Sequence, residues 1–182
     1  MIELKEASCS FSDGFGGKGL FTAVSPLSAH FSDGGRYAIV GESGSGKTTL
    51  ARMIAGLQRP SGGSVFVDGE PIYGRKRAGK EHFRKVQIIQ QNSASALDPK
   101  IPVGKSIEEP LLCFFHMEKE KRRERCRNLM ELCNLSRDYY TRLPSELSGG
   151  EQKRVAIARA LAAEPQLSLI HISEPTRPRL IS

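Results

Sequence analysis

One segment of the chain has the residue types and the spacing to hold a chain of phosphates. Residues 41–48 read GESGSGKT, which matches the pattern G-x-x-x-x-G-K-[ST]. Glycines let the backbone curl until successive N–H groups point inward, and the positive end of a following helix adds to the attraction for an anion. We therefore expect a nucleoside triphosphate site here. Its residues are Gly41, Glu42, Ser43, Gly44, Ser45, Gly46, Lys47, Thr48 and Thr49.

Two side chains at the end of this loop have separate expected roles. Lys47 would reach the β- and γ-phosphates, and the hydroxyl of Thr48 would bind Mg²⁺. The alternative is an ordinary glycine turn. The loop stands between an apolar run, 37–40, and a helical pattern, 47–55, which is the context that a phosphate loop requires. The motif indicates a nucleoside triphosphate and no more, because kinases, GTPases and transport ATPases share it.

A second anion site is predicted where residues 147–152 read LSGGEQ, directly before a helical pattern that runs to about Ala163. Exposed backbone N–H groups, a serine hydroxyl and a helix N-terminus meet there. One chain does not need two phosphate sites for one ATP, so we expect this site to face the nucleotide of a neighbouring chain. The alternative is a loop in which the serine caps the helix. The residues are Leu147, Ser148, Gly149, Gly150, Glu151 and Gln152.

Together the two motifs resemble the ATP-binding cassette family, whose signature is LSGGQ. This chain departs from it only in having Glu151 before Gln152, a common variant. The resemblance covers residues 1 to about 167 and implies ATP and Mg²⁺ as cofactors. It also implies that Phe11 stacks on adenine and that Gln91 contacts Mg²⁺ and the attacking water. The alternatives are a plain core aromatic for Phe11 and a solvated loop amide for Gln91.

Residues 91–99, QNSASALDP, and the phosphate loop look most like the importers of dipeptides, oligopeptides and nickel. In that family the cassettes lie on the cytoplasmic side of two membrane permease subunits, and an external solute-binding protein delivers the solute. The resemblance implies a peripheral position on the cytoplasmic face of the plasma membrane. It implies a second cassette, identical or different, as partner. The transported solute does not follow from these residues.

The strands expected in the first half of the chain predict an α/β fold. Residues 2–11 and 21–31 alternate polar and apolar side chains, which is typical of an antiparallel sheet. Residues 37–40 are wholly apolar, as in a buried parallel strand, and 64–67 and 86–90 are further strand candidates. The resemblance adds a P-loop NTPase core, incomplete in this chain, with an N-terminal antiparallel β subdomain.

A helical subdomain is expected at about 92–150, inserted between core strands. Within 119–135 apolar residues recur at i, i+3, i+4 and i+7 under a heavily charged opposite face, which is typical of an amphipathic helix. The stripe consists of Cys126, Leu129, Met130 and Cys133.

The end of the chain departs from the family pattern. In that family hydrolysis needs a buried aliphatic strand that ends in Asp-Glu, expected at positions 171 and 172, which are His171 and Ile172. Glu174 comes two residues late, which moves a carboxylate about 6 to 7 Å along a strand. Residues 167–178, LSLIHISEPTRP, resemble a translated transposon sequencing adapter.

The expected organisation is therefore a partial cassette over residues 1–167 and a tail outside the family over 168–182. The intact protein is predicted to be a transport ATPase, and this chain is predicted to be deficient in hydrolysis. A non-hydrolysing nucleotide-binding module is the first alternative. A soluble ABC protein of DNA repair or translation is the second; such proteins usually carry paired cassettes or long coiled-coil inserts, and neither pattern is seen here.

Composition limits other classes of function. The chain has 182 residues, of which 38% are hydrophobic, enough for the core of one domain. Its longest apolar stretch, 107–115, is interrupted by Glu108, Glu109 and Pro110, and is shorter than the roughly 20 residues that span a bilayer. We attribute the net charge of +7 to a solvated basic face and expect no nucleic-acid partner. The four cysteines lack metal or disulfide spacing, so we expect small buried hydrophobes.

Overall fold

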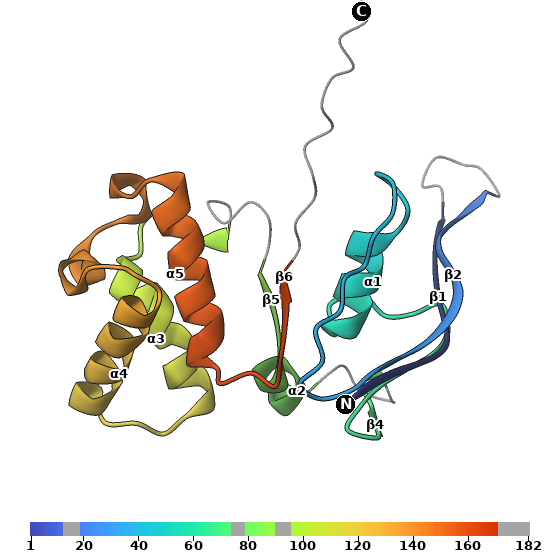
Figure 1. Ribbon diagram of the computed structural model, residues 1–182, viewed down its shortest axis with the longest axis horizontal. Coiled ribbons are helices and arrows are strands. Elements are labelled where there is room, and N and C mark those ends of the chain that lie inside the picture. The colour runs from blue at the N-terminus through green and yellow to red at the C-terminus, as the bar shows by residue number, and fades with distance from the viewer. Residues whose placement is uncertain (13–18, 74–78, 90–95, 171–182) are drawn as a thin grey trace, which may run out of the picture.

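The fold places an antiparallel sheet at one end of the molecule and a group of helices at the other (Figure 1). The computed structural model describes residues 1–12, 19–73, 79–89 and 96–170, and for 167–170 the backbone alone. A pair of parallel strands, β5 (Val86–Ile89) and β6 (Leu167–Ile170), lies between the two groups. The architecture confirms the predicted α/β class.

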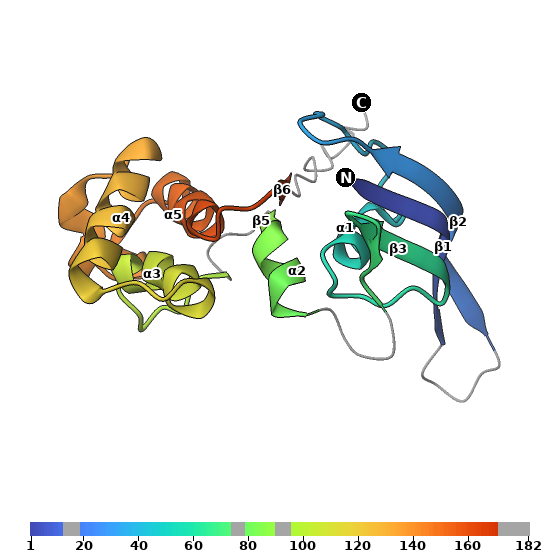
Figure 2. The same cartoon turned by 90° about the horizontal axis from the view of Figure 1, so that it is seen from below.

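The sheet at the first end has the strand order β2-β1-β3-β4, and every neighbouring pair is antiparallel. Figure 2 shows β3 beside β1 and helix α1 against the same sheet. This arrangement confirms the antiparallel sheet expected near the N-terminus. The strands are β1 (Ile2–Ser12), β2 (Leu20–Phe31), β3 (Gly62–Val67) and β4 (Glu70–Pro71).

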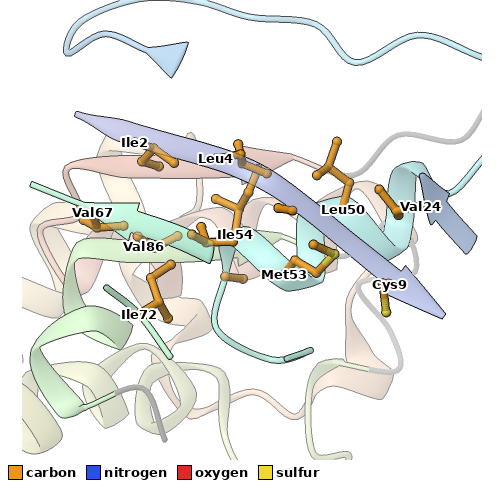
Figure 3. Close-up of a cluster of buried hydrophobic side chains, with 13 residues drawn as sticks. Ile2, Leu4, Cys9, Val24, Leu50, Met53, Ile54, Val67, Ile72 and Val86 are labelled. Carbon is orange, nitrogen blue, oxygen red and sulfur yellow. The ribbon is translucent and has the colours of Figure 1, made fainter. Parts of the chain in front are cut away.

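The core under this sheet joins β1 to α1 (Lys47–Ile54) (Figure 3). The buried residues of β1 change from even to odd numbers because the pairing with both neighbours shifts after Leu4 and Lys5. A bulge therefore keeps both halves of the strand apolar on the α1 side. The buried members of this cluster are Ile2, Leu4, Ala7, Cys9, Val24, Leu50, Met53, Ile54, Ala55, Val65, Val67, Ile72 and Val86.

The helical group has a second core, formed mainly by three helices. They are α3 (Val103–Phe114), α4 (Lys119–Leu132) and α5 (Gly149–Ala162), with the short 3₁₀ turns η2 (Arg137–Thr141) and η3 (Pro144–Glu146) between α4 and α5. The apolar stripe predicted over 119–135 is buried here, which confirms the amphipathic helix. The short helix α2 (Lys80–Lys85) leads into β5. Within the described residues no helix is long and apolar enough to cross a membrane.

The buried strand predicted at residues 37–40 is wrong. This segment is not part of either sheet in the described chain, and Val40 is 90% exposed. A parallel strand is buried when strands pair along its edges and helices cover its faces. Here the segment pairs with neither β1–β4 nor β5–β6, so its apolar side chains face solvent.

The strand β6 begins where the sequence suggested the end of the cassette. It pairs in parallel with β5, from Val86 opposite Leu167 to Ile89 opposite Ile170. The boundary expected between residues 167 and 168 thus falls inside this strand. The division of the chain at that point stays a prediction.

One carboxylate is fully buried in the helical group. Glu108 of α3 accepts hydrogen bonds from Tyr140 Oη at 2.6 Å, from Lys105 Nζ at 3.1 Å and from Arg122 Nε at 3.3 Å. Burial alone would raise the pKa of Glu108, but these three donors hold that pKa below its ordinary value. The carboxylate therefore ties α3 to α4 and to η2 as an ion.

The four thiols differ in exposure, so they should differ in their reactivity toward a thiol reagent. Cys113 is exposed, against the sequence expectation, because it lies on the side of α3 away from the buried stripe; the other three are buried. Burial raises the pKa of Cys126 to about 12 and also raises that of Cys133. Since the thiolate is the reactive form, a disulfide reagent at about pH 8 should modify about one thiol in the folded chain and all four after denaturation.

The matched variant for this measurement is Cys113→Ser. It should remove the fast reaction and leave the folded chain almost unlabelled. Fast labelling that persists in Cys113→Ser would show that one of the buried thiols is accessible, contrary to the packing of both cores.

Candidate functional site

The predicted phosphate loop stands at the beginning of α1. Gly46 is the N-cap residue, with φ +86° and ψ 2°, and Gly44 has φ +83°. Both values lie in the left-handed region that glycine adopts without strain. A Cβ added to Gly46 would lie 2.1 Å from the carbonyl oxygen of Ala23, so the loop packs directly against β2.

The side chain of Lys47 folds back over this loop. Its ammonium donates to the carbonyl oxygen of Gly41 at 2.7 Å, to that of Glu42 at 2.5 Å and to Ser45 Oγ at 3.3 Å. An ammonium has three donors, so the loop's own oxygens engage all of them. The positive charge is thereby held against the loop.

The N-terminus of α1 is open to a negative charge. No side chain caps it, and its first turn contains no acidic residue. The positive end of the helix dipole therefore points toward the loop. Thr48 is exposed in the first turn, while Leu50, Met53 and Ile54 anchor the helix in the core.

Phe11 is located near the end of β1, where it pairs with Phe21 of β2. It continues the alternation of the buried residues Ala7 and Cys9, but it is 41% exposed. Cys9 pairs with Val24, whose side chain also comes within 3.2 Å of a Cβ added to Gly46. The register thus places Phe11 two positions beyond the contact between the sheet and the loop.

The second predicted site forms the first turn of α5. Ser148 is the N-cap: its Oγ accepts from the backbone N–H of Glu151 at 3.3 Å, and Glu151 Oε2 accepts from the Ser148 N–H at 2.7 Å. This is a reciprocal capping box. Leu147 is buried, and Gln152 Nε2 donates to the carbonyl oxygens of Pro144 and Leu147 at 2.9 and 3.1 Å.

The outer surface of this turn is unobstructed. Ser148, Gly149 and Gly150 are all exposed, and a Cβ added to Gly149 would meet no atom within 4 Å. At Gly150 the nearest atom would be Arg154 Nη1, at 4.0 Å. The backbone of the turn can therefore be approached closely from outside.

The structure holds the two predicted anion sites on different parts of the fold. The phosphate loop belongs to the sheet with α1, and the second site belongs to the helical group, with both helices beginning toward the upper end of Figure 1. Sequence reasoning missed Tyr139, whose Oη donates to Glu151 Oε1 at 3.0 Å from η2. Nothing in the spacing of these two residues signalled the contact.

Several residues of the expected site lie outside the described part of the chain. Gln91 is one, and so are His171, Ile172 and Glu174 around the expected Asp-Glu position. Their roles stay as the sequence predicted them.

Comparison with known proteins identifies the family of this chain. The ABC transporter family model matches residues 24–177. The oligopeptide transport ATP-binding protein OppF of Streptococcus pyogenes is 38% identical over 169 residues, covering 91% of this chain and 54% of that protein. The nickel import ATP-binding protein NikE of Brucella suis is 38% identical over 150 residues, or 82% of this chain and 56% of that protein.

A third relative is the dipeptide transport ATP-binding protein DppF of Escherichia coli, 37% identical over 81% of this chain and 45% of that protein. This chain spans about half the length of these curated relatives. Among solved structures, the dimeric post-hydrolysis state of the ATP-binding cassette MJ0796 bound to ADP and Pi has a TM-score of 0.84 and 30% identity. That comparison covers 93% of this chain and 73% of the cassette. This chain therefore belongs to the ABC transporter family.

Proposed function

We propose that the chain is part of the ATP-binding subunit of an importer, and that it binds MgATP on the phosphate loop. The observation that carries this proposal is the N-terminus of α1, which has no side-chain cap and no acidic residue in its first turn, together with the Lys47 ammonium bound to the loop's carbonyl oxygens. Such a site fits a polyphosphate because every donor there favours negative charge.

Each residue of the loop has a role that follows from its position. The Lys47 ammonium would exchange the oxygens of Gly41 and Glu42 for those of the β- and γ-phosphates. The backbone of residues 41–46 would hold the phosphate chain, and Thr48, with Gln91, would bind Mg²⁺. Phe11 would stack on the adenine at the edge of the sheet. Bound Mg²⁺ supplies neutralisation of the charge that develops on the phosphates.

The exposed turn Ser148–Gly150 is proposed to complete the ATP site of a second cassette. Its support is the exposed, unobstructed surface of that turn and its position at the positive end of the α5 dipole. A two-fold pair would then enclose two nucleotides, each between one phosphate loop and one partner turn. A solved relative is described as a dimer bound to ADP and Pi.

Membrane permease subunits and an external solute-binding protein complete the proposed importer. The relatives are named as ATP-binding proteins for oligopeptide transport, dipeptide transport and nickel import. We therefore propose a peptide or nickel importer. The subunit would act peripherally on the cytoplasmic face of the plasma membrane.

A non-hydrolysing nucleotide-binding module is the second candidate. The specific observation in its favour is that His171 and Ile172 occupy the positions where Asp-Glu is expected. Without those carboxylates nothing would orient Mg²⁺ or polarise the attacking water from that strand.

Turnover separates the two candidates. Phosphate release from MgATP should be measured with the purified chain at micromolar concentration, beside Lys47→Ala. Release at the rates usual for transport ATPases, abolished in Lys47→Ala, would establish hydrolysis and reject the binding module. Binding of MgATP without release would establish the module. Failure to bind MgATP at all would contradict both.

A further inference from the structure

The hydroxyl of Ser148 is already engaged by a carboxylate of its own chain. Glu151 Oε2 lies 2.7 Å from Ser148 Oγ and 2.7 Å from the Ser148 backbone nitrogen, and it accepts a hydrogen bond from each. The hydroxyl proton is therefore directed at Glu151. An incoming phosphate oxygen would need that same proton.

Tyr139 holds this carboxylate in place from a different element. Its hydroxyl donates to the other oxygen, Glu151 Oε1, at 3.0 Å. The guanidinium of Arg142 lies 4.1 Å from the centroid of the Tyr139 ring and packs on its face. The Ser148 hydroxyl, the Ser148 N–H and Tyr139 lower the pKa of Glu151, so the side chain is an anion at neutral pH.

A negative side chain at this position acts against a second anion in two ways. It accepts the hydrogen bond that the Ser148 hydroxyl would otherwise donate to a phosphate. It also repels the phosphate across a distance of a few ångströms. A glutamine would keep the capping box, since its side-chain oxygen also accepts the Ser148 N–H, but it carries no charge. The signature LSGGQ has glutamine at this position, and this chain has the common variant with glutamate, so it carries the charged form of the side chain.

We propose that Glu151, anchored by Tyr139, competes with the partner's nucleotide for Ser148 and thereby sets how tightly two cassettes close around ATP. This inference rests on the proposed function, because it needs the exposed turn to face a nucleotide. Glu151 and Tyr139 are positioning residues: they control whether the Ser148 hydroxyl is available.

Self-association with MgATP tests the proposal, measured by sedimentation velocity on wild type, Glu151→Gln and Glu146→Gln. Glu151→Gln should associate about tenfold more tightly, because the competing charge is removed. Glu146→Gln makes the same change of charge five residues earlier, where the carboxylate accepts from the backbone N–H of Leu143 at 2.6 Å and does not bond to Ser148. It should behave as wild type, and an equal gain in both variants would overturn the proposal.

Tyr139→Phe tests the anchor. It keeps the ring under Arg142 but frees Glu151 Oε1, so association should tighten by roughly two- to threefold. In the Glu151→Gln background the same change should add nothing. A tyrosine that only supports the fold would weaken association in both backgrounds, and that result would overturn the anchoring role.

Binding of MgATP to the same samples separates the possible failures. If wild type binds MgATP and associates, but Glu151→Gln is no tighter, the inference fails and the proposed function stands. If every variant binds MgATP and none associates, the proposed pairing of cassettes fails and the inference fails with it.

Discussion

Gly46→Ala should lower the free energy of unfolding by about 2–5 kcal/mol and abolish MgATP binding. The residue has φ +86°, where a Cβ is strained, and the added carbon would lie 2.1 Å from the carbonyl oxygen of Ala23. That oxygen belongs to β2 and cannot rotate away as a side chain could. The loop or the start of α1 must move, and both would form the phosphate site.

Gly44→Ala is the matched control. It has nearly the same backbone angle, φ +83°, but a Cβ there would meet no atom within 4 Å. Only the conformational cost remains, about 1–2 kcal/mol. Urea denaturation followed by circular dichroism measures both variants. Equal losses would mean that the contact with Ala23 does not fix the loop.

Glu108→Ala should destabilise the helical group by about 3–5 kcal/mol. The substitution removes the common partner of Lys105, Arg122 and Tyr140. Arg122 has only 13% of its side chain exposed, so its charge would remain largely buried without this carboxylate. Chemical denaturation of the full chain gives the change in free energy.

Glu109→Ala is the neighbouring control. Glu109 also pairs with an arginine, Arg159 at 2.7 Å, but 58% of the Glu109 side chain is exposed. Exposed pairs contribute about 0–1 kcal/mol, so this variant should be nearly as stable as wild type. A loss as large as that of Glu108→Ala would contradict the special role of burial.

Protonation of Glu108 should lower the stability of the helical group at acid pH. The pKa of Glu108 in the folded chain lies below its ordinary value of 4.5. Its stabilisation is therefore complete above that value and is lost as the pH falls through the lower folded pKa. Glu108→Gln should be less stable at neutral pH and should lose this part of the acid dependence. An unchanged acid profile in Glu108→Gln would assign the transition to other groups.

The parts of the site that were predictable from sequence depend on local interactions. Gly44 and Gly46 of the phosphate loop adopt positive φ angles that glycine accepts easily, and Ser148 with Glu151 forms a capping box within one helical turn. The stripe on α4 follows from helical periodicity alone. The antiparallel pairing of β1 and β2 was likewise indicated by alternation within each segment.

What could not be predicted depends on residues far apart in the chain. The exposure of Val40 follows from which strands pair beside it, and no local pattern contains that information. Glu108 reads in the sequence as an interruption of an apolar stretch, yet partners up to 32 residues away keep it buried as an ion. Tyr139 reaches Glu151 in the same non-local way.

Whether residues 41–48 bind ATP can be measured by equilibrium binding of MgATP to the purified chain and to Lys47→Ala. Lys100→Ala, an exposed lysine outside the loop, serves as the charge-matched control. We expect about one MgATP per chain for wild type and for Lys100→Ala. Binding to Lys47→Ala should be at least about tenfold weaker, because a charge-assisted contact to the phosphates is lost. Equal affinity of Lys47→Ala and wild type would contradict a phosphate site at residues 41–48.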